Sequence, residues 1–120
     1  MTIWKMVLEN EDDKVDFNLY QKLAQRTANH DLEYEKRLAV AGLGLAGEAG
    51  EAGELIKKFL GHGHELDKDE LEKELGDVLW YIAEICAIVN MDMEEVARKN
   101  IGKLYKRYPK GFEVEKSINR

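Results

Sequence analysis

The chain has 120 residues and a formal charge of −6, and 35% of its residues are charged. This length fits one domain with its own core. The acidic balance argues against a general nucleic-acid binder, and no apolar run reaches the roughly 18 residues of a membrane span. Cys86 is the single cysteine, so no internal disulfide can form. The N-terminus does not resemble a signal peptide. We therefore expect a cytoplasmic protein without nucleic-acid or membrane partners.

Helical periodicity dominates the chain, and Pro109 is its only proline. We predict an all-α, four-helix bundle-like domain over 16–112. Its helices should cover about 16–30, 34–60, 67–89 and 92–108. We expect residues 1–15 to be an extension that forms a short strand or a loop, and residues 113–120 to be a loose tail.

Three predicted helix ends carry local signals. Asp67 and Asp92 each precede an apolar periodic segment and have a glutamate three residues later, which is the pattern of a capping box. The second helix ends at the segment 61–64, Gly-His-Gly-His, where a glycine suits a left-handed cap.

Two pairs of acids lie in the second and third predicted helices. Glu48 and Glu51 form the first pair, Glu74 and Asp77 the second, and 22 residues separate the pairs. Because residues three apart are neighbours on a helix face, two adjacent helices would bring four carboxylates together. Such a cluster needs a cation, and Mg²⁺ is usually held by carboxylates together with substrate phosphates. The pattern predicts a magnesium site, with Mn²⁺ as a substitute, that handles a polyphosphate.

A solvated charged face is the alternative for these acids. The apolar stripe of the second helix consists of Leu38, Ala41, Leu45, Ala52, Leu55 and Phe59. At about 100° per residue, Glu48 falls within this stripe, Glu51 at its edge and Glu54 far outside it. Glu74 and Asp77 flank one side of the apolar stripe of the third helix, which consists of Leu71, Leu75, Val78, Ile82, Ile85 and Val89. Their positions favour a packed interface over a solvated face.

The fourth predicted helix carries complementary charge. Asn100, Lys103 and Arg107 share one strip beside its apolar face. The cations could reach phosphates that the metal leaves unneutralised, and the Asn100 amide could bind a sugar or phosphate oxygen. A solvated basic face near the helix C-terminus is the alternative. Lys57 and Lys58 are further candidates for phosphate binding.

The second helix also predicts a homo-oligomer. It contains five glycines, each costing about 1 kcal/mol relative to alanine in a helix interior. They are Gly42, Gly44, Gly47, Gly50 and Gly53. Close approach of neighbouring helices on several sides would explain them, and a kinked helix is the alternative. Trp80 lies nearly opposite the apolar stripe of the third helix, which suggests a second buried face. We expect a homodimer or homotetramer.

Three segments together resemble the MazG-like nucleotide pyrophosphohydrolases. They are residues 42–51 (GLGLAGEAGE), 73–81 (KELGDVLWY) and 100–109 (NIGKLYKRYP). A Glu-x-x-Glu pair alone is not specific, but the whole set in this order is. The likeness extends from about Tyr20 to Phe112.

The resemblance implies an all-α fold that assembles as a dimer or a dimer of dimers. It also implies Mg²⁺-dependent cleavage of a nucleoside triphosphate to the monophosphate and pyrophosphate. By matching positions, the four paired acids would be metal ligands, Asn100 and Lys103 would meet the nucleotide, and Tyr81 would line the pocket. Glu48 or Glu51 could activate the attacking water.

Two alternatives remain at this level. One is a related hydrolase with a narrow substrate, of the dUTPase or dCTPase type, and the other is a helical oligomeric metal-binding protein without turnover. The base is not determined, because Trp4, His30, Trp80 and Tyr81 could each stack on or bond to one.

Overall fold

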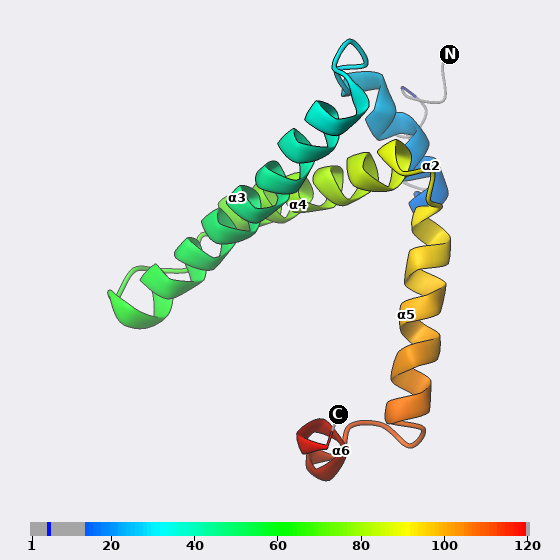
Figure 1. The fold of residues 1–120 in the computed structure, drawn as a ribbon. Helices are drawn as coiled ribbons and strands as arrows, with labels where there is room; N and C mark the ends of the chain where they lie inside the picture. Colours follow the sequence, from blue (N-terminus) through cyan, green and yellow to red (C-terminus); the bar gives the residue numbers. More distant parts are fainter. Residues whose placement is uncertain (1–4, 6–13, 120) are drawn as a thin grey trace.

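The structure, a computed structural model, describes residue 5 and residues 14–119. Residues 1–15, for which we predicted a strand or a loop, lie almost entirely outside this range, as does Trp4. The described chain is helical (Figure 1). Its elements are α2 (Phe17–Ala24), the 3₁₀ turn η1 (Gln25–Thr27), α3 (Tyr34–Gly61), α4 (Lys68–Ile88), α5 (Met93–Arg107) and α6 (Val114–Ile118).

The all-α prediction is confirmed, with two differences in the elements. The first helix ends at Ala24 and tightens into η1, because Thr27 turns its hydroxyl back to the Ala24 carbonyl at 2.8 Å. The segment after Glu113, expected to be loose, contains the short helix α6. No helix in the described part of the chain is long and apolar enough to cross a membrane.

The predicted helix ends are present. The Asp67 carboxylate accepts from the Glu70 amide at 3.0 Å, and Asp92 accepts from the Glu94 amide at 2.9 Å. Gly63, with a φ of 72°, follows the end of α3. Asn90, with a φ of 59°, ends α4 in a Schellman motif, since the Met91 amide reaches back to the Cys86 carbonyl at 2.7 Å.

The core lies where α2, α4 and the start of α5 meet. Its buried members are Ala24, Ala83, Cys86 and Met93, and Tyr20, Leu79, Trp80 and Ile82 pack against them. α4 has the predicted second buried face around Trp80, but this face is covered within the chain, so Trp80 does not support the predicted homo-oligomer. The α2–η1 segment covers this face of α4, and the Trp80 indole donates a hydrogen bond to the Thr27 hydroxyl at 2.8 Å.

α3 and α4 form a long pair, and α5 leaves it (Figure 1). The side chain of Gln21 fixes the corner between α4 and α5, because it donates to the Met91 carbonyl at 2.9 Å and accepts from the Met93 amide at 2.7 Å. α5 packs where it begins and then runs away from the other helices, so one chain does not close a four-helix bundle. The radius of gyration is accordingly 17.4 Å. A compact chain of this length would have about 14 Å.

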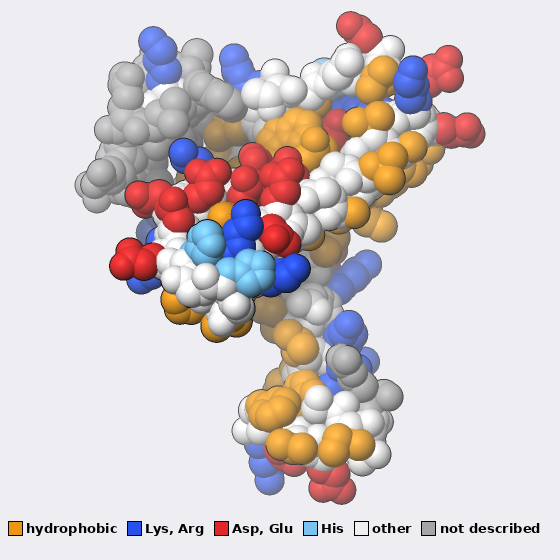
Figure 2. All heavy atoms as spheres, turned by 90° about the vertical axis from the view of Figure 1, so that its left-hand side faces the viewer, with side chains coloured by type: hydrophobic (Ala, Val, Ile, Leu, Met, Phe, Trp, Pro, Cys, Tyr) orange, Lys and Arg blue, Asp and Glu red, His pale blue; other side chains and the backbone are white. Residues whose placement is uncertain are grey.

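Large apolar side chains are exposed on two surfaces. The outer face of α3 includes Leu43, which is 76% exposed. The second surface, formed by the second half of α5, by α6 and by the segment between them, exposes Ile101, Leu104, Tyr105, Phe112, Val114 and Ile118. Apolar side chains are visible on the α6 end of the molecule in Figure 2. Several large apolar side chains exposed on one segment are typical of an interaction surface.

The five glycines of α3 differ in their surroundings. At Gly44 an added Cβ would overlap the ring of Tyr81, so here the predicted close approach exists within one chain. At Gly42, Gly47, Gly50 and Gly53, a Cβ would meet no described atom within 4 Å. Contacts within the described chain therefore explain one glycine of the five.

Candidate metal centre

α3 and α4 bring three of the predicted ligands together. One carboxylate oxygen each from Glu48, Glu74 and Asp77 lies within 4.8 Å of the others. Glu51, one turn after Glu48 on α3, adds its negative charge to the surroundings of Glu74. Glu54 is exposed on the outer side of α3.

The cluster contains polar atoms that lack partners. Glu48 and Glu74 are half-buried, and the Oε2 atom of each is buried without a hydrogen-bond partner among the described residues. Leaving such an oxygen unsatisfied costs about 1–3 kcal/mol, more if it is charged. A hard divalent cation would satisfy both atoms, since carboxylate oxygens are its preferred ligands. The residues present therefore fit Mg²⁺ or Mn²⁺.

The same crowding changes the acidity of the centre. The neighbouring carboxyl groups of Glu48 and then Glu51, which can share a proton with Glu74, raise its pKa from 4.5 to about 7. Desolvation and repulsion between the charges act in the same direction. Without metal, the cluster therefore holds a proton below about pH 7, and a cation has to displace it there.

This raised pKa predicts the pH dependence of the metal-free protein. Between pH 4.5 and 7 the folded state binds more protons at Glu74 than the unfolded state does. The contribution of Glu74 to stability is therefore present at low pH and lost as the pH rises through about 7. Thermal unfolding in EDTA should show a midpoint that falls over this interval, and Mg²⁺ should reverse the fall. In Glu74→Gln the fall should be smaller, and an unchanged slope would contradict the assignment.

A cavity of about 340 Å³ adjoins the acids. It is lined by Thr27, Glu48, Asp77, Trp80 and Tyr81. The Trp80 and Tyr81 rings meet edge to face, with centroids 5.0 Å apart and an interplanar angle of 88°. The cavity thus joins an aromatic wall to the carboxylates, which suits a ligand with a ring at one end and phosphates at the other.

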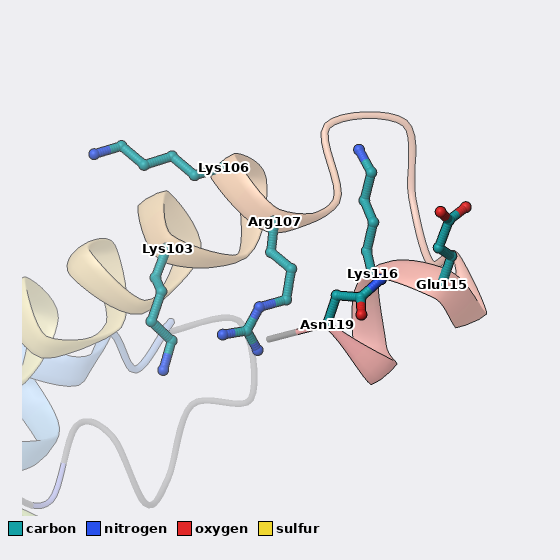
Figure 3. Close-up of a pocket in the computed structure, with 6 residues that line it drawn as sticks. All are labelled: Lys103, Lys106, Arg107, Glu115, Lys116 and Asn119. Carbon is teal, nitrogen blue, oxygen red and sulfur yellow. The ribbon is translucent and has the colours of Figure 1, made fainter.

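The predicted basic residues are not brought to the acids within one chain. Asn100 is exposed on α5, while Lys103 and Arg107 line a separate cleft of about 600 Å³ with α6 (Figure 3). The cause is the direction of α5, which packs against α2 and α4 near its beginning and then runs away from the α3–α4 pair.

Lys57 and Lys58 are exposed near the C-terminal end of α3. The helical rise places Lys58 about 10 Å beyond Glu51 along the axis. Figure 2 shows acidic, basic and histidine side chains gathered at this end of the α3–α4 pair. His62 and His64 lie in its loop with ring centroids 6.4 Å apart.

Sequence reasoning missed a buried polar group on α4, one helical turn after the cavity residue Trp80. Glu84 is 5% exposed and pairs with Arg37 at 2.7 Å. The available signal was the position of Glu84, an isolated acid between Ala83 and Ile85 in the apolar half of α4. Thr27, which the sequence did not single out as a site residue, lies in the cavity wall.

The fold and the site together define a helical protein with a carboxylate centre suited to a divalent cation. The model of the MazG nucleotide pyrophosphohydrolase domain matches residues 39–112, and the chain belongs to this family. The resemblance seen in the sequence is thereby confirmed, and the family implies a pyrophosphatase-type hydrolase.

A curated relative, the Gene 37 protein of Mycobacterium phage L5, is 33% identical over 111 residues. The alignment covers 86% of this chain and 97% of the relative. No solved structure gives a significant match.

Proposed function

We propose that the protein is a Mg²⁺-dependent nucleoside triphosphate pyrophosphohydrolase. It would convert a nucleoside or deoxynucleoside triphosphate and water to the monophosphate and pyrophosphate, as a housecleaning enzyme of the nucleotide pool. The observation that carries the proposal is the acid cluster with two unpartnered buried oxygens, placed directly beside an aromatic cavity.

Glu48, Glu74 and Asp77 would hold the ion, and Glu51 would complete the set as the acid least committed to it. When bound, Mg²⁺ or Mn²⁺ would polarise the phosphoryl group and acidify a coordinated water. Glu48 and Glu51 are the candidate bases, and Glu51 is favoured because it lies outside the three converging acids. It would take the proton as the water oxygen bonds to the α-phosphorus. The bond from that phosphorus to the α–β bridging oxygen breaks, and pyrophosphate carries away the electron pair.

The remaining predicted residues would bind the substrate. Tyr81 would line the nucleoside end of the pocket, and Lys57 and Lys58 would attract the distal phosphates. Lys103 and Arg107, with Asn100, do not adjoin the acids of their own chain. We expect them to reach the pocket of a second copy, whose acidic centre is complementary to their charge.

A second copy also fits the exposed apolar surfaces. α3 has open glycines and the exposed Leu43 on its outer face, and the second surface, of α5, α6 and the segment between them, exposes the six large apolar side chains named above. A symmetric dimer or a dimer of dimers would cover both surfaces and provide the close helix approaches that four α3 glycines lack in one chain.

Leu43→Glu should therefore weaken assembly. Light scattering at micromolar concentration should show a dimer or tetramer for the parent and a smaller species for the variant. Activity should fall with assembly, because the pocket would lose the partner's cations. Lys36→Glu, at an exposed polar position of the same helix, is the control. A parent that is monomeric and fully active would contradict the proposed assembly.

The function itself is tested by incubating the protein with Mg²⁺ and a panel of nucleoside and deoxynucleoside triphosphates. We expect monophosphate and pyrophosphate in equal amounts, and no product in EDTA. Release from a single nucleotide would favour a narrow dUTPase- or dCTPase-type hydrolase. Absence of product from every nucleotide would favour a metal-binding protein without turnover.

A further inference from the structure

A buried polar cluster joins η1, α3 and α4, and its α4 member lies one helical turn after Trp80, which lines the cavity. Arg37 of α3 holds Glu84 of α4 with two hydrogen bonds, from Nε at 3.0 Å and from Nη2 at 2.7 Å. Gln25 of η1 donates to the same carboxylate at 2.9 Å and accepts from Arg37 Nη2 at 2.9 Å. The three side chains thus form a closed ring of charge-assisted hydrogen bonds.

The cluster is built for a fixed geometry. The side chains of Arg37 and Glu84 are only 16% and 6% exposed. Burial alone would raise the pKa of Glu84, but the hydrogen bonds from Arg37 and Gln25 outweigh it and hold the pKa below its usual value. The carboxylate is therefore ionised at neutral pH. His30 closes the loop after η1 through a hydrogen bond to the Gln25 carbonyl at 2.9 Å.

A short covalent path connects this cluster with the cavity wall. Gln25 begins η1, and Thr27 ends it. The Thr27 hydroxyl donates to the Ala24 carbonyl and accepts from the Trp80 indole, both at 2.8 Å. Thr27 and Trp80 line the cavity beside Glu48 and Asp77. Because Gln25 and Thr27 belong to the same 3₁₀ turn, the hydrogen bonds that hold Gln25 in place also hold Thr27 and, through it, Trp80 in the cavity wall.

We propose that Glu84, Arg37 and Gln25 are positioning residues that hold η1 against α4, and so set the Thr27–Trp80 wall for the nucleoside end of the substrate. The inference rests on the proposed function. The cluster would then affect substrate affinity through the cavity wall, although it touches neither metal nor phosphate. The competing explanation is an ion pair that only stabilises the fold.

Substitutions separate these two roles. Removing one partner of a buried pair leaves an unpaired charge, whereas replacing both by apolar residues is often neutral for stability. Glu84→Gln should therefore lower the thermal midpoint, and Arg37→Met with Glu84→Met should largely restore it. If the cluster positions η1, KM should rise at least tenfold in Glu84→Gln, while kcat should stay within threefold of the parental value. The double variant should show the same rise in KM although its stability is restored. The thermal shift caused by Mg²⁺ alone should stay at the parental value.

Thr27→Val should reproduce the KM defect, because it removes the acceptor of the indole, and Thr27→Ser should rescue it. Glu95→Gln is the matched control, since Glu95 pairs with Arg98 at 3.6 Å on the surface. A double variant with parental KM would overturn the proposal and leave the proposed function intact. A parent without any turnover would instead refute the proposed function.

The packing of Trp80 in the cavity wall can also be measured by spectroscopy, which does not depend on turnover. In a Trp4→Phe background, Trp80 is the only tryptophan. The double variant should shift Trp80 emission to longer wavelength and weaken its near-ultraviolet circular dichroism, as Thr27→Val should. Parental spectra in the double variant would show that the cluster does not hold the wall, and would overturn the inference.

Discussion

Asp77→Asn and Glu74→Gln should each slow nucleotide hydrolysis by at least about 100-fold, which corresponds to about 2.7 kcal/mol in the barrier. Each change removes a charged ligand oxygen from the cluster while keeping the shape of the side chain. Helical circular dichroism should be unchanged. The acids repel one another without metal, so removing one charge does not weaken the metal-free fold. Thermal stability in EDTA should stay level or rise.

The response to metal is the second measurement on these variants. Mg²⁺ should raise the thermal midpoint of the parent by mass action on the folded state, and much less in either variant. Glu54→Gln removes an acid from the same helix but from its exposed side, so it should retain parental activity and the parental Mg²⁺ shift. Parental rates in both ligand variants would show that the metal centre is misplaced.

Gly44→Ala should raise KM tenfold or more with little loss of stability. The new Cβ would overlap the Tyr81 ring, so the ring has to leave its place in the cavity wall. Alanine favours the helix by up to about 1 kcal/mol over glycine, which offsets part of the strain in the folded state. Steady-state kinetics and thermal unfolding measure the two effects separately.

A double-mutant cycle tests whether Tyr81 transmits the effect. Tyr81→Ala should raise KM by itself, and Gly44→Ala should add little in that background, because the overlap is gone. Gly61→Ala serves as the control, since a Cβ there meets no described atom within 4 Å. Its KM should be parental. If the changes in KM caused by Gly44→Ala and Tyr81→Ala are additive, Gly44 acts through another contact.

Local periodicity and end signals were enough to predict the main helices. Asp67 and Asp92 cap α4 and α5 where the sequence places them, since an N-cap acts on amides only two or three residues away. Glu48 lies between the buried Ala41 and Ala52 on α3, so its inward position also follows from local spacing. These features depend on contacts within a few turns of one helix.

The faces of α4 could not be assigned in this way. Both sides of this helix are partly apolar, and spacing alone does not say which element covers which side. The α2–η1 segment covers Trp80, whereas Leu75 on the expected core stripe is 54% exposed. Long-range packing decided this, through contacts such as Thr27 with Trp80, which are 53 residues apart.

The sequence by itself determined the helices and the inward position of Glu48, because both follow from the helical repeat. Only the tertiary structure decided that Glu84 joins Arg37 and Gln25, and that α5 carries Lys103 and Arg107 away from the acids of the same chain. The physical reason is that a side chain's partner depends on the angle at which helices meet. Here that angle is set by non-local hydrogen bonds such as those of Gln21 to the α4–α5 corner.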